Sequence, residues 1–376
     1  MPPERNSWYC SRVIRKLKQR ILHIIDTLDR TGTAEQLCLL ARGLPRDEFE
    51  VHVCALSHGG SIADALARAG IPVHVIGRRW SADPTTFWQL VRHVNAVRPE
   101  MIHAWQAAGR AYSAAVAQYC GVRRLVAVWR EVQSNHWPLQ GTIDRSIGRR
   151  ASTVVATCPV VRDDCLQRGI PAEKIQVISS GVCRAVPPVT TRGQILNRLG
   201  LPESVRLIAW AGQLEADRGG KDAIWAADLL KVIRDDVHLL IFGAGPHRDR
   251  LIRFRDQVEI GDKVHFLGER GDFNEFLPHV DQFWSTRKLP GQSQAILEAM
   301  AAGVPVVATD LPGTRDLIEH ETTGYLFAPG HRAGLARWAE HLLNHGDVAR
   351  QIGLAGQQRV ESAFSAEKMV REWKKV

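Results

Sequence analysis

The sequence predicts an α/β protein made of two doubly wound parallel sheets that face each other across a cleft. Its length of 376 residues is greater than that of a domain with one ordinary hydrophobic core, and it fits two domains. Short β-branched runs alternate with helical patterns along almost the whole chain, which is typical of parallel strands joined by crossover helices. A stretch rich in Pro and Thr, Val186-Pro187-Pro188-Val189-Thr190-Thr191, separates two such series and marks a linker.

The expected strands fall into two groups, one on each side of that linker. The first group is expected at 21–26, 51–56, 72–76, 101–104, 125–129, 153–156 and 175–178. The second group is expected at 207–211, 238–242, 264–267, 282–284, 305–308 and 324–327. Apolar residues at helical spacing, such as Leu37, Leu40 and Ala41, fill the gaps. Ligands of such folds bind at the carboxyl ends of the strands, so we expect the site in the cleft between the domains.

These patterns divide the chain into five parts. We expect a basic segment at 1–20, a first domain at 21–186, a linker at 187–203, a second domain at 204–350 and C-terminal helices at 351–376. In the basic segment, Trp8 and Tyr9 precede five basic residues, a composition that suits contact with lipid headgroups. These residues are Arg12, Arg15, Lys16, Lys18 and Arg20. A solvated, frayed terminus is the alternative.

Composition excludes several protein classes. No apolar run approaches the roughly 20 residues that span a bilayer, so we expect a cytoplasmic protein, with contact at the inner face of the membrane as a variant of that location. The seven cysteines are odd in number and contain no CxxC pair, which argues against a disulfide framework and against a zinc site. No other ligand cluster suggests a metal.

The positive charge lies in the N-terminal half. Residues 1–186 hold 25 Lys and Arg against 15 Asp and Glu, whereas the rest of the chain holds 24 against 25. Nucleic acid is one interpretation, but no binding motif or basic stripe with interleaved aromatics supports it, so no nucleic acid is expected. An anionic membrane surface or an acidic acceptor fits the same charge.

Four loops have the residue types that bind a phosphorylated ligand. Gly32 lies at a strand-to-helix turn, where backbone N–H groups and the helix N-terminus can approach an anion. Gly243-Ala244-Gly245 forms a second such turn, but Arg248 replaces the third glycine of the dinucleotide fingerprint, so a nicotinamide cofactor is not indicated. Arg218 follows the first strand of the second domain, where a guanidinium suits a diphosphate. Leu311-Pro312-Gly313-Thr314 is a further turn suited to an anion.

The most specific stretch runs from Pro290 to Thr309. It combines a glycine turn, a helix of small residues and a buried strand. Glu298 is the one carboxylate on that nearly apolar helix, and burying it without a partner would be costly. A ligand hydroxyl is one possible partner for it; a structural arginine is the alternative.

In this order, the segments resemble the retaining glycosyltransferases of family four, whose fold is called GT-B and consists of two Rossmann-like domains. The likeness extends from about Ile21 to the C-terminus and is strongest in Ile296-Leu297-Glu298-Ala299-Met300-Ala301-Ala302-Gly303-Val304-Pro305 and in Thr323-Gly324-Tyr325-Leu326-Phe327. The resemblance implies transfer of a sugar from a UDP- or GDP-linked donor to a hydroxyl of a glycan or lipid-linked acceptor, in surface polysaccharide or glycolipid synthesis. It implies no further cofactor.

The resemblance also assigns roles to individual residues. It implies that Glu298 holds the donor ribose and that Arg218 clamps the diphosphate. We expect Arg130 to replace a missing charge from the other side of the cleft. The donor-binding residues that the resemblance implies are Gly32, Thr33, Gly212, Gln213, Gly243, Gly268, Gly291, Gln292, Glu298, Gly313 and Thr314. The final helical stretch is expected to cross back onto the first domain.

The chain departs from the family pattern around this one pocket. Pro290 replaces the first acid of the paired-glutamate motif, and Gln213 replaces an arginine of the diphosphate clamp. Thr33 replaces a glycine, Arg130 stands where many members have histidine, and Ser180 replaces an asparagine. These changes therefore leave two functions open. The chain is an active transferase, or it is a catalytically weakened relative that binds a nucleotide sugar or a partner protein. Epimerisation of a nucleotide sugar is a third alternative.

Overall fold

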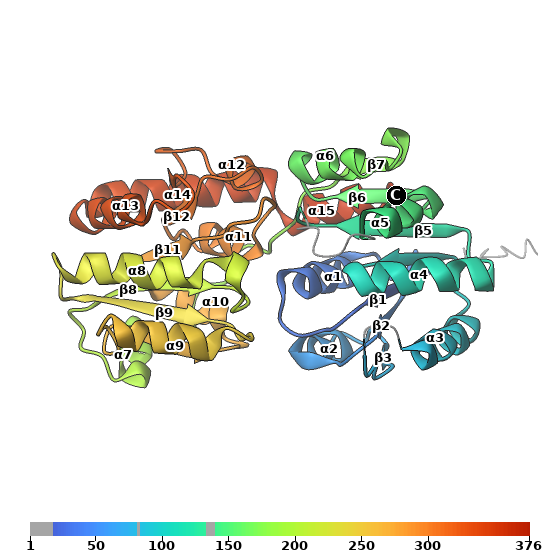
Figure 1. The fold of residues 1–376 in the computed structure, drawn as a ribbon, viewed down its shortest axis with the longest axis horizontal. Helices are drawn as coiled ribbons and strands as arrows, with labels where there is room; N and C mark the ends of the chain where they lie inside the picture. Colours follow the sequence, from blue (N-terminus) through green and yellow to red (C-terminus); the bar gives the residue numbers. More distant parts are fainter. Residues whose placement is uncertain (1–17, 81–82, 133–139) are drawn as a thin grey trace, which may run out of the picture.

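The structure is a computed structural model that describes residues 18–80, 83–132 and 140–376. It contains two parallel sheets, each covered by helices and placed side by side along the long axis of the molecule (Figure 1). Of the residues that we expected to touch lipid, those from Trp8 to Lys16 lie outside the described part of the chain, Lys18 is exposed, and Arg20 belongs to the first strand. No helix within the described ranges is long and apolar enough to cross a bilayer.

The first domain contains a seven-stranded parallel sheet in the order β3-β2-β1-β4-β5-β6-β7. Its strands are β1 (Gln19–Ile25), β2 (Phe49–Ala55), β3 (Val73–Val75), β4 (Met101–Ala104), β5 (Arg124–Trp129), β6 (Thr153–Ala156) and β7 (Ile175–Val177). Its helices are α1 (Gly32–Gly43), α2 (Gly60–Arg68), α3 (Pro84–Val97), α4 (Ala107–Cys120), α5 (Gln140–Arg150) and α6 (Pro159–Gln167). Because β1 and β4 are neighbours, the strand order reverses between them, and this places the loops after β1 and β4 at a ligand-binding crevice.

The second domain contains a six-stranded parallel sheet in the order β10-β9-β8-β11-β12-β13. Its strands are β8 (Arg206–Ala211), β9 (Val237–Phe242), β10 (Val264–Gly268), β11 (Gln282–Ser285), β12 (Val306–Thr309) and β13 (Tyr325–Phe327). Its helices are α7 (Arg192–Leu199), α8 (Gly220–Lys231), α9 (Arg248–Gln257), α10 (Phe273–Phe276), α11 (Gln294–Ala301), α12 (Thr314–Leu317), α13 (Arg332–Asn344) and α14 (Gly346–Ala363). Every expected strand is present, with ends shifted by at most two residues.

The linker is shorter than expected. Helix α7 lies inside the expected range 187–203, and its Ile195 and Leu196 are buried in the core of the second domain. The expected boundary at 351 falls inside α14, which packs on α11 and so belongs to the second domain. The sequence did not reveal this, because an amphipathic helix has the same pattern on either domain.

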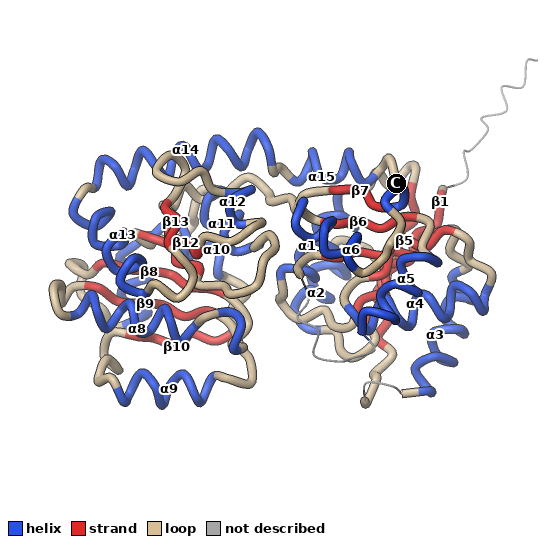
Figure 2. The backbone as a smooth tube through the Cα atoms, turned by 45° about the horizontal axis from the view of Figure 1, so that its top comes forward, coloured by secondary structure: helices blue, strands red, loops and turns tan. Residues whose placement is uncertain are grey.

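The last helix, α15 (Ala366–Trp373), packs on the first domain (Figure 2). The chain crosses between the domains at Ser365, beside Val182: Val182 N–H donates to Phe364 at 2.9 Å and Ala366 N–H donates to Val182 at 3.0 Å. Beyond this crossing, Met369, Val370 and Trp373 enter the core of the first domain next to α1. The two domains are therefore joined by two adjacent chain segments.

Candidate functional site

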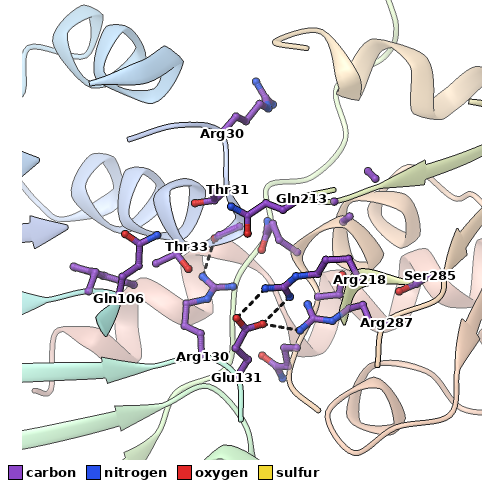
Figure 3. Close-up of a pocket in the computed structure, with 18 of the residues that line it drawn as sticks. Arg30, Thr31, Thr33, Gln106, Arg130, Glu131, Gln213, Arg218, Ser285 and Arg287 are labelled. Carbon is purple, nitrogen blue, oxygen red and sulfur yellow. Dashed lines mark hydrogen bonds and ion pairs between the residues drawn. The ribbon is translucent and has the colours of Figure 1, made fainter. Parts of the chain in front are cut away.

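A cavity of about 360 Å³ lies between the two domains, at the carboxyl ends of both sheets (Figure 3). The first domain lines it with the loops after β1, β4 and β5, and the second domain with the loops after β8 and β11 and the start of α11. The predicted residues that line it are Gly32, Thr33, Arg130, Gly212, Gln213, Arg218 and Gln292. The structure thus brings seven of the predicted site residues together in one interdomain cavity.

An ion cluster joins the domains at the centre of this cavity. The carboxylate of Glu131, from the loop after β5, accepts two hydrogen bonds from Arg218, at 2.7 and 3.0 Å. The same carboxylate accepts a third from Arg287, at 2.9 Å, and Figure 3 shows all three contacts as dashed lines. Burial alone would raise the pKa of the Glu131 carboxyl, but the hydrogen bonds from Arg218 and the charges of Arg218, Arg287 and Arg130 lower it to about 2. Glu131 is therefore ionised at neutral pH.

Both clustered arginines retain unused hydrogen-bond donors. The Nε atoms of Arg218 and Arg287 are buried and make no hydrogen bond to any described residue. Burial lowers the pKa of Arg287, with the charge of Glu131 acting against that effect, and two guanidinium groups this close repel each other. An anionic ligand beside the two guanidinium groups would screen this repulsion.

Arg130 lies beside the cluster but binds its own domain. Its Nη1 donates to the carbonyl of Gly32 at 2.8 Å, and its Nη2 donates to the hydroxyl of Ser180 at 3.3 Å. Burial lowers the pKa of Arg130 to about 10, although Glu131 counteracts part of this effect. Arg130 thus fixes the first turn of α1 at the cavity, and it remains charged at neutral pH.

Gly32 is placed where the two domains touch. A Cβ atom on Gly32 would lie 2.9 Å from the Cβ of Gln294, so a side chain here would push α1 away from α11. Gln294 in turn accepts a hydrogen bond from Gln36 of α1 at 2.7 Å. The absence of a side chain at residue 32 therefore lets the domains close over the cavity.

Glu298 lies in a smaller cavity of about 100 Å³ that shares Gly32, Gly212 and Gln294 with the larger one. Gly243 also lines it, and there the backbone approach is tight: a Cβ atom would lie 2.0 Å from the carbonyl oxygen of Gly212. Burial, and then the neighbouring carboxylate of Glu35 across the domain gap, hold the pKa of the Glu298 carboxyl well above its usual range. Among the described residues no arginine forms an ion pair with Glu298, although the charge of Arg30 lowers its pKa in part; Gln294, its hydrogen-bond donor at 3.4 Å, is neutral.

Four predicted residues lie behind the cavity wall and are not among its lining residues. Gly268 accepts a hydrogen bond from Gly243 at 2.8 Å. Gly291 pairs with Glu131 in a backbone bridge, and Gly313 packs so closely on Gly291 that a Cβ atom would lie 2.6 Å from its backbone. The amide of Thr314 donates to Leu311 at 3.0 Å and so is already occupied. These residues support the lining loops in this structure.

The departures at 290 and 213 have visible structural consequences. The carbonyl of Pro290 accepts a hydrogen bond from Val132 of the first domain at 3.1 Å, so backbone rather than a carboxylate fills this position. Gln213 lines the cavity without a charge, and Arg287 supplies a second cation from the loop after β11. Sequence reasoning missed Glu131 and Arg287 because neither belongs to a recognised motif. Their positions directly after an expected strand were the available signal.

Comparisons with known proteins agree with this geometry. Residues 191–359 match the family of glycosyl transferases group 1, and residues 30–185 match Glycosyltransferase Family 4. The N-acetyl-alpha-D-glucosaminyl L-malate synthase of Bacillus anthracis is 27% identical over 55% of this chain and 54% of that protein. The glycogen synthase of Mycobacterium tuberculosis is 26% identical over 81% of this chain and 71% of that protein. The chain spans about half the length of the first of these relatives.

Solved structures share the whole fold. The complex of Anabaena HepE with UDP-glucose superposes with a TM-score of 0.84 at 21% identity, covering 95% of this chain and 98% of that one. WaaG, a glycosyltransferase involved in lipopolysaccharide biosynthesis, superposes with a TM-score of 0.75 at 13% identity, covering 94% and 98%. The arrangement of two facing α/β domains is therefore the one these proteins share.

Proposed function

Because the chain belongs to glycosyltransferase family 4 and has its GT-B fold, we propose that it is a cytoplasmic enzyme that transfers a sugar from a nucleotide sugar to a hydroxyl acceptor with retention of configuration. The observation that carries the proposal is the arginine cluster at the domain interface. Relatives named for lipopolysaccharide core biosynthesis, such as LpsD of Rhizobium meliloti at 22% identity, support an acceptor in surface polysaccharide or glycolipid synthesis.

The charges of the cluster suit a diphosphate. Among the residues that line the cavity, Arg130, Arg218 and Arg287 face the single carboxylate of Glu131, which gives this part of the lining a net charge of +2. Asp217 and Glu215 contact Arg218 at 3.6 and 3.9 Å from outside the lining. A sugar-linked diphosphate carries about two negative charges, so it would neutralise the cluster. The other charged lining residues have partners that do not line the cavity: Arg30 pairs with Glu35, Asp26 with Arg78 and Arg110 with Asp144. Within the lining, the positive charge thus gathers at the place where the diphosphate is proposed to bind.

We assign the nucleoside to the smaller cavity, next to Gly243, with Glu298 accepting hydrogen bonds from the ribose hydroxyls. A ribose there supplies the hydrogen-bond donors that the buried carboxyl lacks. UDP is the first nucleotide to test, since the HepE structures hold UDP and UDP-glucose, and GDP is the second.

The proposed mechanism depends mainly on electrostatics. As the sugar–phosphate bond lengthens, negative charge grows on the departing diphosphate, and the guanidinium groups of Arg218 and Arg287, which line the cavity, stabilise that charge. The acceptor hydroxyl approaches the same face of the sugar from loops of the first domain, near Thr33 and Gln106. Closure of the domains at Gly32 and Gln294 positions the reactants and limits access of water.

A donor screen tests this proposal. The purified chain is incubated with UDP- and GDP-linked sugars and a panel of glycan acceptors, and release of nucleoside diphosphate is followed. Proton NMR of the product then reports whether the anomeric configuration is retained. We expect release that falls at least about 100-fold in Arg218→Gln and is unchanged in Arg248→Gln, an exposed arginine outside both cavities. Absence of turnover with every donor and acceptor would contradict the proposal.

The alternative is a relative that binds a nucleotide sugar without turnover, and Pro290 and Gln213 motivate it. The double variant Pro290→Glu with Gln213→Arg separates the two functions. If the native chain binds UDP without turnover and the double variant transfers sugar, the native chain is a binding protein and not an active transferase. If the native chain turns over, the substitutions at 290 and 213 are compatible with catalysis in this protein. An isomerised donor in the absence of acceptor would instead reveal epimerisation.

A further inference from the structure

An exposed aromatic cluster lies on the first domain, away from the interdomain cavity. Trp88 of α3 and Tyr119 of α4 are 56% and 60% exposed, and their ring centroids are 5.5 Å apart. Phe87 packs beneath both, at 5.2 Å from Trp88 and 5.7 Å from Tyr119. Trp80, in the segment that leads to α3, is 57% exposed. Phe87 also packs against the core of the first domain, whereas Trp88 and Tyr119 stay exposed and α3 buries Leu90, Val91 and Val94.

The surface around the cluster contains few charges. The exposed residues of α4 are Ala107, Ala111, Ala115, Gln118 and Tyr119. Helix α3 exposes a single charged side chain, Arg92, one helical turn after Trp88. An ordinary solvent-facing helix carries charged side chains on its outer face, as α9 of the second domain does. The outer faces of α3 and α4 therefore carry few charges for surfaces in contact with water, and their exposed polar side chains, such as Gln89, Asn95 and Gln118, are mostly uncharged.

The charges in the chain segment that holds these two helices are nearly all positive. Residues 84–124 contain five arginines against one carboxylate, Glu100. Arg110 is buried, and the other four arginines, Arg92, Arg98, Arg123 and Arg124, are exposed. Exposed Trp and Tyr rings beside arginines, with little opposing charge, match the chemistry of an anionic lipid surface: the rings enter the headgroup region and the guanidinium groups contact phosphates.

We propose that this α3–α4 face, formed by Trp80, Trp88, Arg92 and Tyr119, docks on an anionic membrane surface. Helix α3 lies on the side of the first domain that points away from the second domain in both views (Figures 1 and 2). Docking there leaves the interdomain cavity open and the second domain free to move against the first. The inference does not depend on the proposed transfer reaction, and its test uses no nucleotide sugar.

Vesicle sedimentation tests the proposal with the full chain. We expect binding to vesicles of phosphatidylcholine with 30% phosphatidylglycerol, taken as roughly the anionic content of a membrane leaflet, and little binding to phosphatidylcholine alone. Trp88→Ala with Tyr119→Ala should weaken the partition by about tenfold or more, and Arg92→Gln by about fivefold. The matched controls are Trp225→Ala and Arg350→Gln, exposed residues of the second domain, which should bind as the native chain does. Circular dichroism melting checks that each variant folds.

Three outcomes would overturn the proposal. The first is that the native chain does not sediment with anionic vesicles. The second is a double aromatic variant that binds as well as the native chain, which would assign lipid contact to another segment. The third is a native dimer in analytical ultracentrifugation that the aromatic substitutions convert to a monomer, because the face would then be an interface between two copies of the chain.

Discussion

Glu131→Gln is the most informative single substitution at the ion cluster. In the structure the carboxylate of Glu131 occupies hydrogen-bond donors of Arg218 and Arg287 that a diphosphate would use. A bound diphosphate must displace at least part of these contacts. Glutamine keeps the size and shape of the side chain but removes the charge, so we expect nucleoside diphosphates to bind more tightly to the variant.

The structure gives the size of the effect. The pKa of Glu131 falls from its ordinary 4.5 to about 2, and a tenfold change in an equilibrium corresponds to about 1.36 kcal/mol. The contacts thus favour the ionised carboxylate by about 3 kcal/mol. Its side chain is 33% exposed, so solvent screening reduces this to about 2 kcal/mol. If binding releases that interaction, the variant should bind UDP up to about 30-fold more tightly.

Isothermal titration calorimetry with UDP measures this change. The matched control is Glu215→Gln, a second carboxylate near Arg218 at 3.9 Å, which is more exposed and makes no hydrogen bond to that guanidinium. We expect the control to change UDP affinity by less than about twofold. Unchanged or weaker UDP binding in Glu131→Gln would refute the reasoning and would mean that Glu131 helps to build the anion site.

Three further substitutions test other parts of the structure. Arg287→Gln should weaken UDP binding by about tenfold or more, measured by calorimetry, because a charge-assisted contact is lost; native affinity would argue against its role. Glu298→Gln should raise the melting temperature at pH 8 and leave it unchanged at pH 4. The folded-state pKa of Glu298 is raised, so its carboxyl destabilises the fold only as pH rises above the unfolded value. The same variant should bind UDP more weakly, and an equal melting shift at both pH values would contradict this explanation. Trp373→Ala should lower the free energy of unfolding by about 3 kcal/mol in urea titrations, since this side chain is buried against Trp105 in the first domain; an equal loss in the control Trp225→Ala would contradict it.

The stability that the ion cluster provides depends on pH with the opposite sign to the effect of Glu298. The folded-state pKa of Glu131 lies below its unfolded value, so the stability that its contacts provide is present above about pH 4.5 and is lost as pH falls toward 2. Between pH 5 and 8 we therefore expect this cluster to keep its charge, and any pH dependence of stability in that range has other sources such as Glu298.

The strands and their grouping were predictable from sequence, because buried parallel strands have continuous apolar runs. The runs at 101–104 and 153–156 have the same bounds in the structure as the patterns indicated. Helix α7 was not predicted, since Pro187 and Pro188 suggested an extended segment, and the capping box at Thr191 that starts the helix follows them directly. A helix that begins so soon after two prolines is therefore harder to predict than a buried strand.

The site was predictable only where a motif existed. Arg218 and Gly32 were found because each occupies a recognisable turn, and both line the cavity. Glu131 and Arg287 were not found, because their contact joins loops 156 residues apart and depends on how closely the domains approach. Gly313 has a motif-like turn, but it packs on Gly291 and does not line the cavity, a distinction that needs coordinates.

The central claim is that Arg218 and Arg287 bind a diphosphate between the two domains. Calorimetry that compares UDP with UMP, in the native chain and in the double variant Arg218→Gln with Arg287→Gln, tests it most directly. We expect UDP to bind the native chain at least about tenfold more tightly than UMP, and this preference to disappear in the double variant. Equal affinities in the native chain, or a preference that survives in the double variant, would contradict the claim.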